Sequence, residues 1–499
     1  MFQLSSFQIH NDIISFLPEL YLITSINIIL VYSVVYSTSP FFDYPLLLNN
    51  NSWLCILILF FTLLLNLANT SYNIILFNDL IILDPFNIAV KFVILFLSIF
   101  ILIMSLRYNH LELLNNPEFP VILLLSVLGT LLLVSSYDLL VLYLAIELQS
   151  FCSYILTSFK RNSEFSTEAG LKYFILGAFS SSFLLFGCSL VYGFTGTTNY
   201  SLLSLLVLNC NSIFSSGNGI VIGCSFIFIS FLFKLSAAPF HVWSPDIYEG
   251  APIVVTTFFI VIQKLGLLTF FLRLFFGSFY SVFKFWQPLL AIVCLISMIV
   301  GSFGALWQTK FKRLLAFSSI GHIGYILVAL CCSSFESIYA LVFYSFVYSV
   351  TNVSSFIILL ILRKSSDNKR IKYIEDLVIV AKTNPLLGIF LVITFFSIAG
   401  VPPLAGFFSK MFVFLNSVGQ DIFSLAVIGM LSSVVSCFYY LKIVQTSFFE
   451  RIGNFFTMKK IGKELSFLIS IVNIFLVIFF IHPSLFSVLM HLVIYDLFF

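Results

Sequence analysis

Charged and titratable side chains inside long apolar stretches are the residues of this sequence that could do chemistry. They are Glu147, Lys172, Lys234, Lys264, His322, Lys410 and Lys442. Removal from water destabilises a lysine ammonium and a nearby carboxylate stabilises it again, so such a lysine can bind and release a proton near neutral pH. A row of Lys, Glu and His side chains, joined by hydroxyls and trapped water, is what a proton relay needs. The pattern predicts proton movement through the protein, with hydroxyls from Ser236, Ser318, Ser319 and Tyr325.

Two other interpretations of these residues remain open at the level of the sequence. Any single Lys and Glu could pair only to neutralise each other and to fix the packing of two helices. His322, in the segment GHIGY, could equally be a hydrogen-bonded imidazole of the core. For the whole set a relay is favoured, because several lysines around the one central carboxylate, Glu147, make a poor neutralising scheme.

Five further charged residues lie near the ends of apolar stretches, where long side chains reach the membrane surface. For Glu19, Lys91, Asp138, Arg273 and Glu336 we therefore predict interfacial anchors. Asp246 and Glu249 in the segment HVWSPDIYEGAP predict a tight hinge together with His241, and too few ligands converge there for a metal site. The nine cysteines show no C-x-x-C spacing, which predicts neither a disulfide framework nor a metal cluster.

The composition sets the class of fold. Of 499 residues, 60% are hydrophobic and only 9% are charged, and continuous apolar stretches recur along nearly the whole chain. A bilayer-spanning helix needs about 20 mostly apolar residues, so we predict an all-α integral membrane protein with about 14 transmembrane helices in a lipid bilayer. The net charge of +3 without a basic stripe argues against binding to nucleic acid.

Two of the predicted helices, the seventh and the twelfth, contain proline. They hold the segments FKLSAAPFHVW and AGVPPLAGFFSK, each with one lysine, and proline interrupts the backbone ladder. The two broken helices are five helices apart, and five is odd, so the pattern predicts two inverted repeats, helices 4–8 and helices 9–13. The predicted units are residues 1–118 (helices 1–3), 119–285 and 286–450 (the repeats), and 451–499 (helix 14).

The loops predict an orientation. Basic residues such as Lys160, Arg363, Lys369 and Arg451 concentrate in loops after odd-numbered helices. By the positive-inside rule these loops face the matrix, or the cytoplasm in a bacterium, and both termini lie on the opposite side.

Between about residues 119 and 450 the sequence resembles the antiporter-like subunits of respiratory complex I. The hinge FHVWSPDIYEGAP, the lysine at position 410 and the short C-terminal end match the branch that contains bacterial subunit N rather than the branches of subunits 4 and 5. The resemblance implies a proton-translocating subunit of the mitochondrial inner membrane, driven by NADH:ubiquinone electron transfer elsewhere in the complex. It implies that Glu147 pairs with Lys234, that Lys264 and His322 form a central relay and that Lys410 is the outlet. Lys172 matches a basic residue of helix six and is a possible further member.

The resemblance also implies cofactors and partners. Flavin, iron–sulfur clusters and quinone belong to other subunits, and this chain has no cofactor. The partners implied are other membrane-arm subunits, including subunit 4 and subunit 4L. Two alternatives stay open: a subunit of a multi-subunit cation/proton antiporter, and a structural membrane subunit that conducts nothing.

Overall fold

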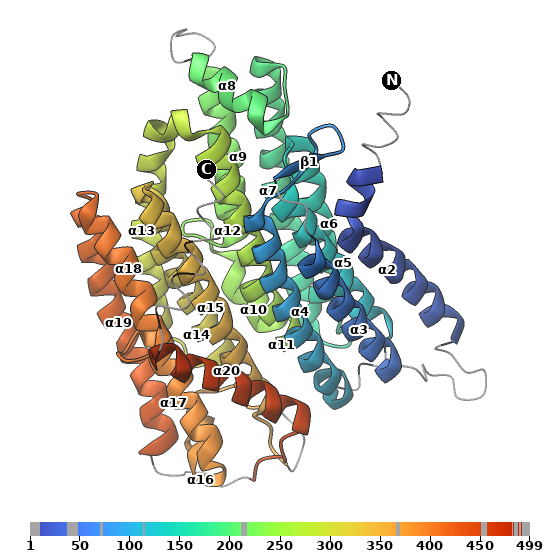
Figure 1. Ribbon diagram of the computed structural model, residues 1–499. Helices are drawn as coiled ribbons and strands as arrows, with labels where there is room; N and C mark the ends of the chain where they lie inside the picture. Colours follow the sequence, from blue (N-terminus) through green and yellow to red (C-terminus); the bar gives the residue numbers. More distant parts are fainter. Residues whose placement is uncertain are drawn as a thin grey trace.

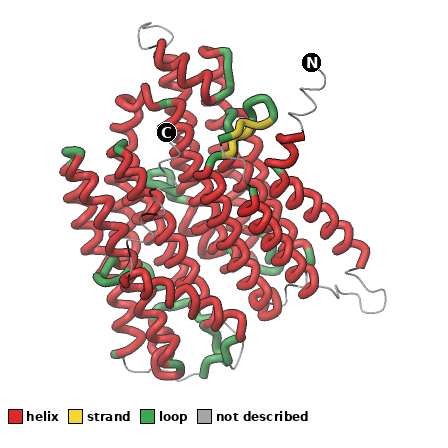
Figure 2. The backbone as a smooth tube through the Cα atoms, viewed as in Figure 1, coloured by secondary structure: helices red, strands yellow, loops and turns green. Residues whose placement is uncertain are grey.

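The computed structural model describes residues 10–36, 48–69, 73–112, 114, 116–210, 217–365, 370–450, 457–481, 483, 488 and 491. Helices make up nearly all of this part of the chain (Figure 2). Both ends of the chain, together with Lys369 and Arg451 of the predicted orientation, lie outside the described residues.

The N-terminal part contains three long helices and one short β-hairpin. The helices are α2 (Leu17–Tyr36), α3 (Leu48–Ala68) and α4 (Pro85–Glu112), and the antiparallel strands are β1 (Ile74–Leu76) and β2 (Ile81–Leu83). The hairpin lies beside the upper part of this helix group in Figure 1.

The middle of the chain contains an interrupted helix followed by a helix with π-helical turns. The elements are α5 (Glu118–Ser135), α6 (Leu139–Thr157), α7 (Glu164–Thr195), α8 (Tyr200–Cys210), α9 (Gly217–Leu235), α10 (Trp243–Gly250), α11 (Ile253–Phe258), η1 (Phe259–Gln263), α12 (Lys264–Leu272), η2 (Arg273–Ser278) and η3 (Tyr280–Val282). The segments η1 and η2 are π-helical, so the stretch from α11 to η2 is one continuous membrane-length helix with two widened turns.

The C-terminal part contains the second interrupted helix. Its elements are α13 (Phe283–Leu306), α14 (Phe311–Cys332), α15 (Phe335–Ile361), η4 (Glu375–Ile379), α16 (Val380–Thr383), α17 (Pro385–Ala399), α18 (Ala405–Gly419), α19 (Phe423–Phe448) and α20 (Lys463–Ile481). In Figure 1, α19 lies at one side of the molecule and α2 at the other.

Helix length and composition define a multi-spanning membrane protein. Within the described residues, 11 helices are long and apolar enough to cross a bilayer, and the interrupted helices add shorter apolar segments, Gly219–Leu235 and Pro385–Ala399. Within an apolar window of 18 residues, the span Ile253–Ser278 is 100% buried inside the chain and α14 and α15 are 94% buried, whereas α7 is only 33% buried. The core is thus built around the helix that carries Lys264.

Three residues predicted as interfacial anchors are buried instead. Lys91 Nζ of α4 lies 2.5 Å from Glu19 Oε1 of α2, with both side chains 2% exposed. Arg273 is ion-paired with Asp84 and is also buried. The prediction was wrong for Glu19, Lys91 and Arg273, because each buried charge has an opposite charge from a distant part of the chain, which removes the need to reach water.

The other two predicted anchors lie at helix starts, where Asp138 is also buried, against the prediction, and only Glu336 is exposed. Asp138 caps α6, with its carboxylate accepting hydrogen bonds from the backbone N–H of Leu140 and from Thr198 Oγ1, both at 2.7 Å. Glu336 is exposed in the first turn of α15.

Candidate functional site

The break between α9 and α10 carries Lys234 in the last helical turn before it. Helix α9 ends at Leu235, and Ser236 adopts a left-handed conformation (φ 62°) at the start of the turn that contains Pro239. The indole of Trp243 donates a hydrogen bond to the carbonyl oxygen of Phe233 at 3.1 Å, so one carbonyl at the interruption is satisfied by a group that does not titrate.

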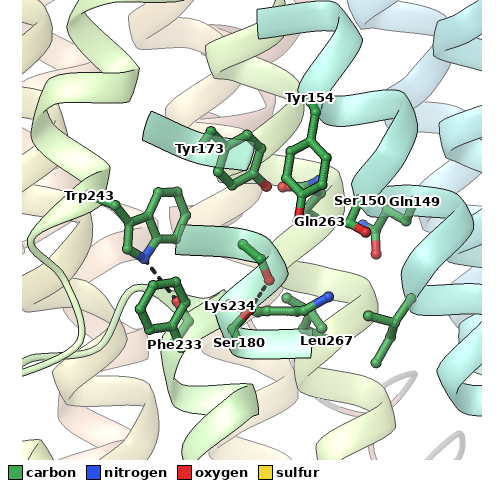
Figure 3. Close-up of a pocket in the computed structure, with 12 residues that line it drawn as sticks. Gln149, Ser150, Tyr154, Tyr173, Ser180, Phe233, Lys234, Trp243, Gln263 and Leu267 are labelled. Atoms are coloured by element: carbon green, nitrogen blue, oxygen red, sulfur yellow. Dashed lines mark hydrogen bonds between the residues drawn. The ribbon is translucent and has the colours of Figure 1, made fainter. Parts of the chain in front are cut away.

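A small cavity lies beside this first break (Figure 3). Among its lining residues are Gln149, Ser150, Tyr154, Tyr173, Lys234 and Gln263. Lys234 Nζ is buried and has no hydrogen-bond partner among the described residues. The ammonium is therefore held in a polar-lined space without a fixed contact.

Glu147 on α6 lies near this cavity but does not contact Lys234 directly. Its Oε2 accepts a hydrogen bond from Ser150 Oγ at 3.3 Å, while Oε1 is buried without a partner among the described residues. No ion pair within 4.0 Å joins Glu147 and Lys234, although the carboxylate acts on the ammonium through space. The pairing that the resemblance implies is thus a longer-range interaction.

Lys264 lies at the junction between a π-helical and an α-helical segment of the fully buried helix. It follows the segment η1 directly, is 3% exposed, and its Nζ has no hydrogen-bond partner within the described part of the chain. The ring of Tyr248 lies 5.9 Å from the ammonium. Gln263 and Leu267 of the same helix line the first cavity, whereas Lys264 itself is not among its lining residues. Widened π-turns often occur at functional sites, and no pattern in the sequence predicted this one.

His322 on α14 is hydrogen-bonded at both ring nitrogens. Nδ1 lies 2.7 Å from Tyr344 Oη, and Nε2 lies 3.3 Å from Tyr440 Oη. Sequence reasoning missed these two tyrosines, which belong to α15 and α19. Of the hydroxyls it named, Tyr325 is paired with Ser432 at 3.0 Å.

Two of the three serines proposed for the relay are hydrogen-bonded to the backbone of their own helix. Ser318 and Ser319 donate hydrogen bonds to carbonyls of their own helix, α14. Ser236 Oγ is buried at the first break with no hydrogen-bond partner among the described residues.

The second break, between α17 and α18, places Lys410 against the backbone. Helix α17 ends at Ala399, and Gly400 has a left-handed φ of 82°. Lys410 Nζ donates a hydrogen bond to the carbonyl oxygen of Ala399 at 2.7 Å. A Cβ on Gly406 would lie 1.7 Å from the carbonyl oxygen of Ser397, so the two helix ends meet at backbone distance.

A second small cavity joins this break to His322. Residues that line it include His322, Tyr344, Tyr348, Thr351, Ser409 and Lys410. Lys410 and His322 therefore face one shared space.

Two of the lysines from the sequence lie apart from the cavities. Lys172 is 44% exposed and pairs with Glu168 at 2.7 Å and with Asp246 at 3.4 Å. Lys442 is exposed on α19. The apolar sequence around both lysines predicted that they would be buried. Both are exposed instead, because each side chain extends from the outward-facing side of its helix.

The hinge residues link the two halves of the chain through ion pairs. Asp246 contacts Arg313 at 2.7 Å, and Glu249 contacts both Lys310 and Arg313, so α10 is joined to the start of α14. Within the described residues, no group of three or more His, Cys, Asp or Glu side chains is arranged to hold a metal ion.

A second charge cluster, centred on Glu112, connects distant loops. The Glu112 carboxylate accepts hydrogen bonds from Lys160, Arg363 and Arg370, each at 2.7 Å. Although burial alone lowers the pKa of Arg370, its contacts with Tyr108 and Glu112 raise that pKa above the ordinary arginine value. The cluster therefore remains ionised.

The fold and the buried lysines beside two interrupted helices define a multi-spanning, antiporter-like membrane protein. Residues 136–436 match the family model described as "NADH:quinone oxidoreductase/Mrp antiporter, TM". The chain is 45% identical over 478 residues to NADH-ubiquinone oxidoreductase chain 2 of Marchantia polymorpha, covering 95% of this chain and 96% of the relative. It is 42% identical over 379 residues to NADH-quinone oxidoreductase subunit N of Pelagibacter ubique (strain HTCC1062), covering 76% and 79%.

A solved structure has the same fold. A chain of respiratory complex I from Thermus thermophilus with bound aureothin superposes with a TM-score of 0.76 at 24% identity, covering 94% of this chain and 98% of that one. The chain belongs to the family of NADH-ubiquinone oxidoreductase chain 2 and NADH-quinone oxidoreductase subunit N.

Proposed function

We propose that this chain is a proton-translocating membrane subunit of respiratory NADH:ubiquinone oxidoreductase, complex I. Its relatives over nearly the whole chain are subunits of that enzyme. The observation that carries the mechanism is the pair of cavities, each beside an interrupted helix and each holding a buried lysine ammonium. Buried ionisable groups that face polar space inside a membrane protein mark ion pathways.

The relay that we propose runs from Glu147 and Lys234 through Lys264 and His322 to Lys410. Lys234 and Gln263 line the first cavity, and His322 and Lys410 line the second. Lys264 belongs to the buried helix whose Gln263 and Leu267 line the first cavity. A cavity with several polar lining groups is suited to water, which would connect stations that do not touch. Lys172 lies on the surface, so we leave it out of this relay.

We further propose two inverted repeats within a fourteen-helix architecture, counting each interrupted helix as one. The first repeat runs from α5 to η2 and the second from α13 to α19, with their boundary at Phe283, where α13 begins, rather than at residue 286. Equivalent features support this: each break begins with a left-handed residue, Ser236 or Gly400, and each has one buried lysine beside it.

Location and partners follow from the proposed function. The ion-paired basic residues Lys160, Arg313 and Arg363 belong to loops or helix starts that we assign to the matrix side of the mitochondrial inner membrane. Subunits 4 and 4L are the proposed neighbours. Flavin, iron–sulfur clusters and quinone are assigned to other subunits.

Replacing the central lysine tests the proposal. Lys264→Met removes the titrating group but keeps a side chain of similar length, so we expect assembled complex with NADH-driven proton pumping lowered at least roughly tenfold. Lys382→Ala, a surface lysine that contacts a backbone carbonyl, is the matched control. Native gels stained for NADH oxidase report assembly, and a pH-sensitive dye in the same membranes reports pumping.

Two outcomes favour the alternatives. Full pumping by an assembled Lys264→Met complex would make the chain a structural subunit. Migration of the chain away from NADH oxidase activity, with cation-driven proton flux, would make it part of a cation/proton antiporter.

A further inference from the structure

The imidazole of His322 is held between two tyrosine hydroxyls that come from different helices. Tyr344 of α15 approaches Nδ1 at 2.7 Å, and Tyr440 of α19 approaches Nε2 at 3.3 Å. His322 is 6% exposed, Tyr344 is 2% exposed and Tyr440 is fully buried. The ring and both hydroxyls are therefore shielded from bulk solvent.

A hydroxyl can either donate or accept a hydrogen bond at the same position. A neutral imidazole has one N–H and one bare nitrogen, so one tyrosine must accept from the ring while the other donates to it. A protonated imidazole has two N–H groups, and both tyrosine oxygens must then accept. Two hydroxyls satisfy both protonation states of a buried ring, which a pair of ionised carboxylates, able only to accept, would not do.

The surroundings give Tyr344 room to change its role. When the ring gains a proton at Nδ1, the Tyr344 O–H must turn to another acceptor. Tyr344 and His322 line the second cavity together with Thr351, Ser409 and Lys410, so polar space lies beside that hydroxyl. Tyr325, by contrast, is hydrogen-bonded to Ser432 and is not among the residues bonded to the ring.

The position of the ring makes these contacts relevant to transport. His322 lines the same cavity as Lys410, so the imidazole faces the lysine of the second break across that shared space. Leaving a buried N–H without an acceptor costs the full desolvation penalty of that group. Without the hydroxyls, the charged state of the ring would lack acceptors at the point where a proton must pass.

We propose that Tyr344 and Tyr440 are positioning residues that keep His322 hydrogen-bonded in both of its protonation states. They hold the ring in one orientation and switch between donor and acceptor as it gains or loses a proton. This proposal rests on the proposed relay and extends it to two residues that do not themselves carry a permanent charge.

A double-mutant cycle with His322 tests the proposal in the assembled complex. Tyr344→Phe and Tyr440→Phe keep the ring and remove only the hydroxyl, and we expect each to lower NADH-driven proton pumping roughly tenfold. In a His322→Gln background, neither Phe substitution should lower pumping further, because tyrosines that act through the imidazole have nothing left to position. Tyr200→Phe is the control, since Tyr200 is also buried and its hydroxyl contacts the carbonyl of Asp138 at 3.4 Å.

The outcomes separate this proposal from the one on which it rests. Additive losses in the His322→Gln background, or wild-type pumping by both Phe variants, would overturn the role of the tyrosines while the relay stands. Wild-type pumping by His322→Gln itself would remove His322 from the relay and this proposal with it. If the Tyr344→Phe complex fails to assemble, the Tyr440→Phe variants, with and without His322→Gln, show whether a tyrosine hydroxyl acts through His322.

Discussion

At each of the two proline breaks a backbone carbonyl oxygen near the end of a helix accepts a hydrogen bond, but the donor differs between the breaks. At the first break a carbonyl near the end of α9 accepts from the indole of Trp243, and the ammonium of Lys234 has no hydrogen-bond partner within the described residues. At the second break the ammonium of Lys410 itself donates to Ala399. The difference indicates that Lys234 can change its charge without disturbing the backbone, whereas each proton lost by Lys410 weakens a contact that holds two helix ends together.

Packing also differs between the breaks. The ends of α17 and α18 meet at backbone distance around Gly406, whereas the first break is spanned by a separate turn from Ser236 to Val242 that leads into α10. The second site is therefore expected to tolerate less change than the first.

The largest effect is expected at Gly406. In Gly406→Ala the new Cβ would collide with the carbonyl oxygen of Ser397, so the backbone of the second break must shift, and we expect most of the assembled complex to be lost. Native gel electrophoresis of the membranes measures this. Gly193→Ala, in a helix where nothing lies within 4 Å of the added Cβ, should assemble normally. Normal assembly of Gly406→Ala would mean that the second break is as adaptable as the first.

Replacing the two lysines sharpens the contrast. Lys234→Met and Lys410→Met should both lower proton pumping at least roughly tenfold, because neither retains a titrating group. Only Lys410→Met should also reduce the amount of assembled complex, since a buried carbonyl without its donor costs about 1–3 kcal/mol. Pumping and native gels on the same membranes separate the two effects.

Arginine at position 410 provides the matched control. Lys410→Arg keeps a donor for Ala399, so assembly should recover, but guanidinium scarcely deprotonates and pumping should stay low. Full pumping by Lys410→Arg would show that this lysine holds structure only. Equal assembly of Lys234→Met and Lys410→Met would remove the proposed difference between the breaks.

A smaller effect is expected from the carboxylate near the first break. Glu147→Gln keeps the shape of the side chain but removes the charge that acts on Lys234 through space, so turnover should fall a few-fold while assembly is unchanged. NADH oxidation coupled to pumping in membrane vesicles measures it. Unchanged turnover would mean that Lys234 can carry protons without a nearby carboxylate. It would then resemble Lys410, whose hydrogen bond goes to a backbone carbonyl.

The smallest effect is expected at Lys172. Its ammonium is exposed and pairs with two carboxylates that are themselves exposed, so Lys172→Ala should leave assembly and pumping close to those of the wild type. The same assays apply. A strong loss of pumping in an assembled Lys172→Ala complex would return this residue to the relay and extend the first site to the surface of α7.

Features set by local chemistry could be predicted from the sequence. Proline lacks a backbone N–H, so Pro239 and the pair Pro402-Pro403, deep in apolar stretches, predicted the two interruptions that the structure shows. Lys264 and Lys410 were recognised because a lysine in a long apolar stretch has few ways to reach water, and the structure buries both. These inferences need only a residue and its near neighbours.

Features that depend on which way a helix faces could not be predicted. Lipid is as apolar as the protein core, so the side of a membrane helix that meets lipid has the same composition as the side that packs inward. This is why the sequence predicts an interior position for the exposed Lys172 and two separate surface anchors for the buried pair of Glu19 and Lys91. Tyr344 and Tyr440 were missed for the same reason, since the sequence has 22 tyrosines and only packing selects the two beside His322.

The cluster at Glu112 bears on how the chain is made. Two of its cationic partners, Arg363 and Arg370, come 251 and 258 residues later in the sequence. During synthesis the N-terminal helices enter the membrane long before these arginines leave the ribosome, so until then Glu112 has only Lys160 of the three partners available to it. A nascent chain that stops before residue 363 therefore lacks the ion pairs that join its first and last thirds, and assembly of this cluster is one of the last steps in making the protein.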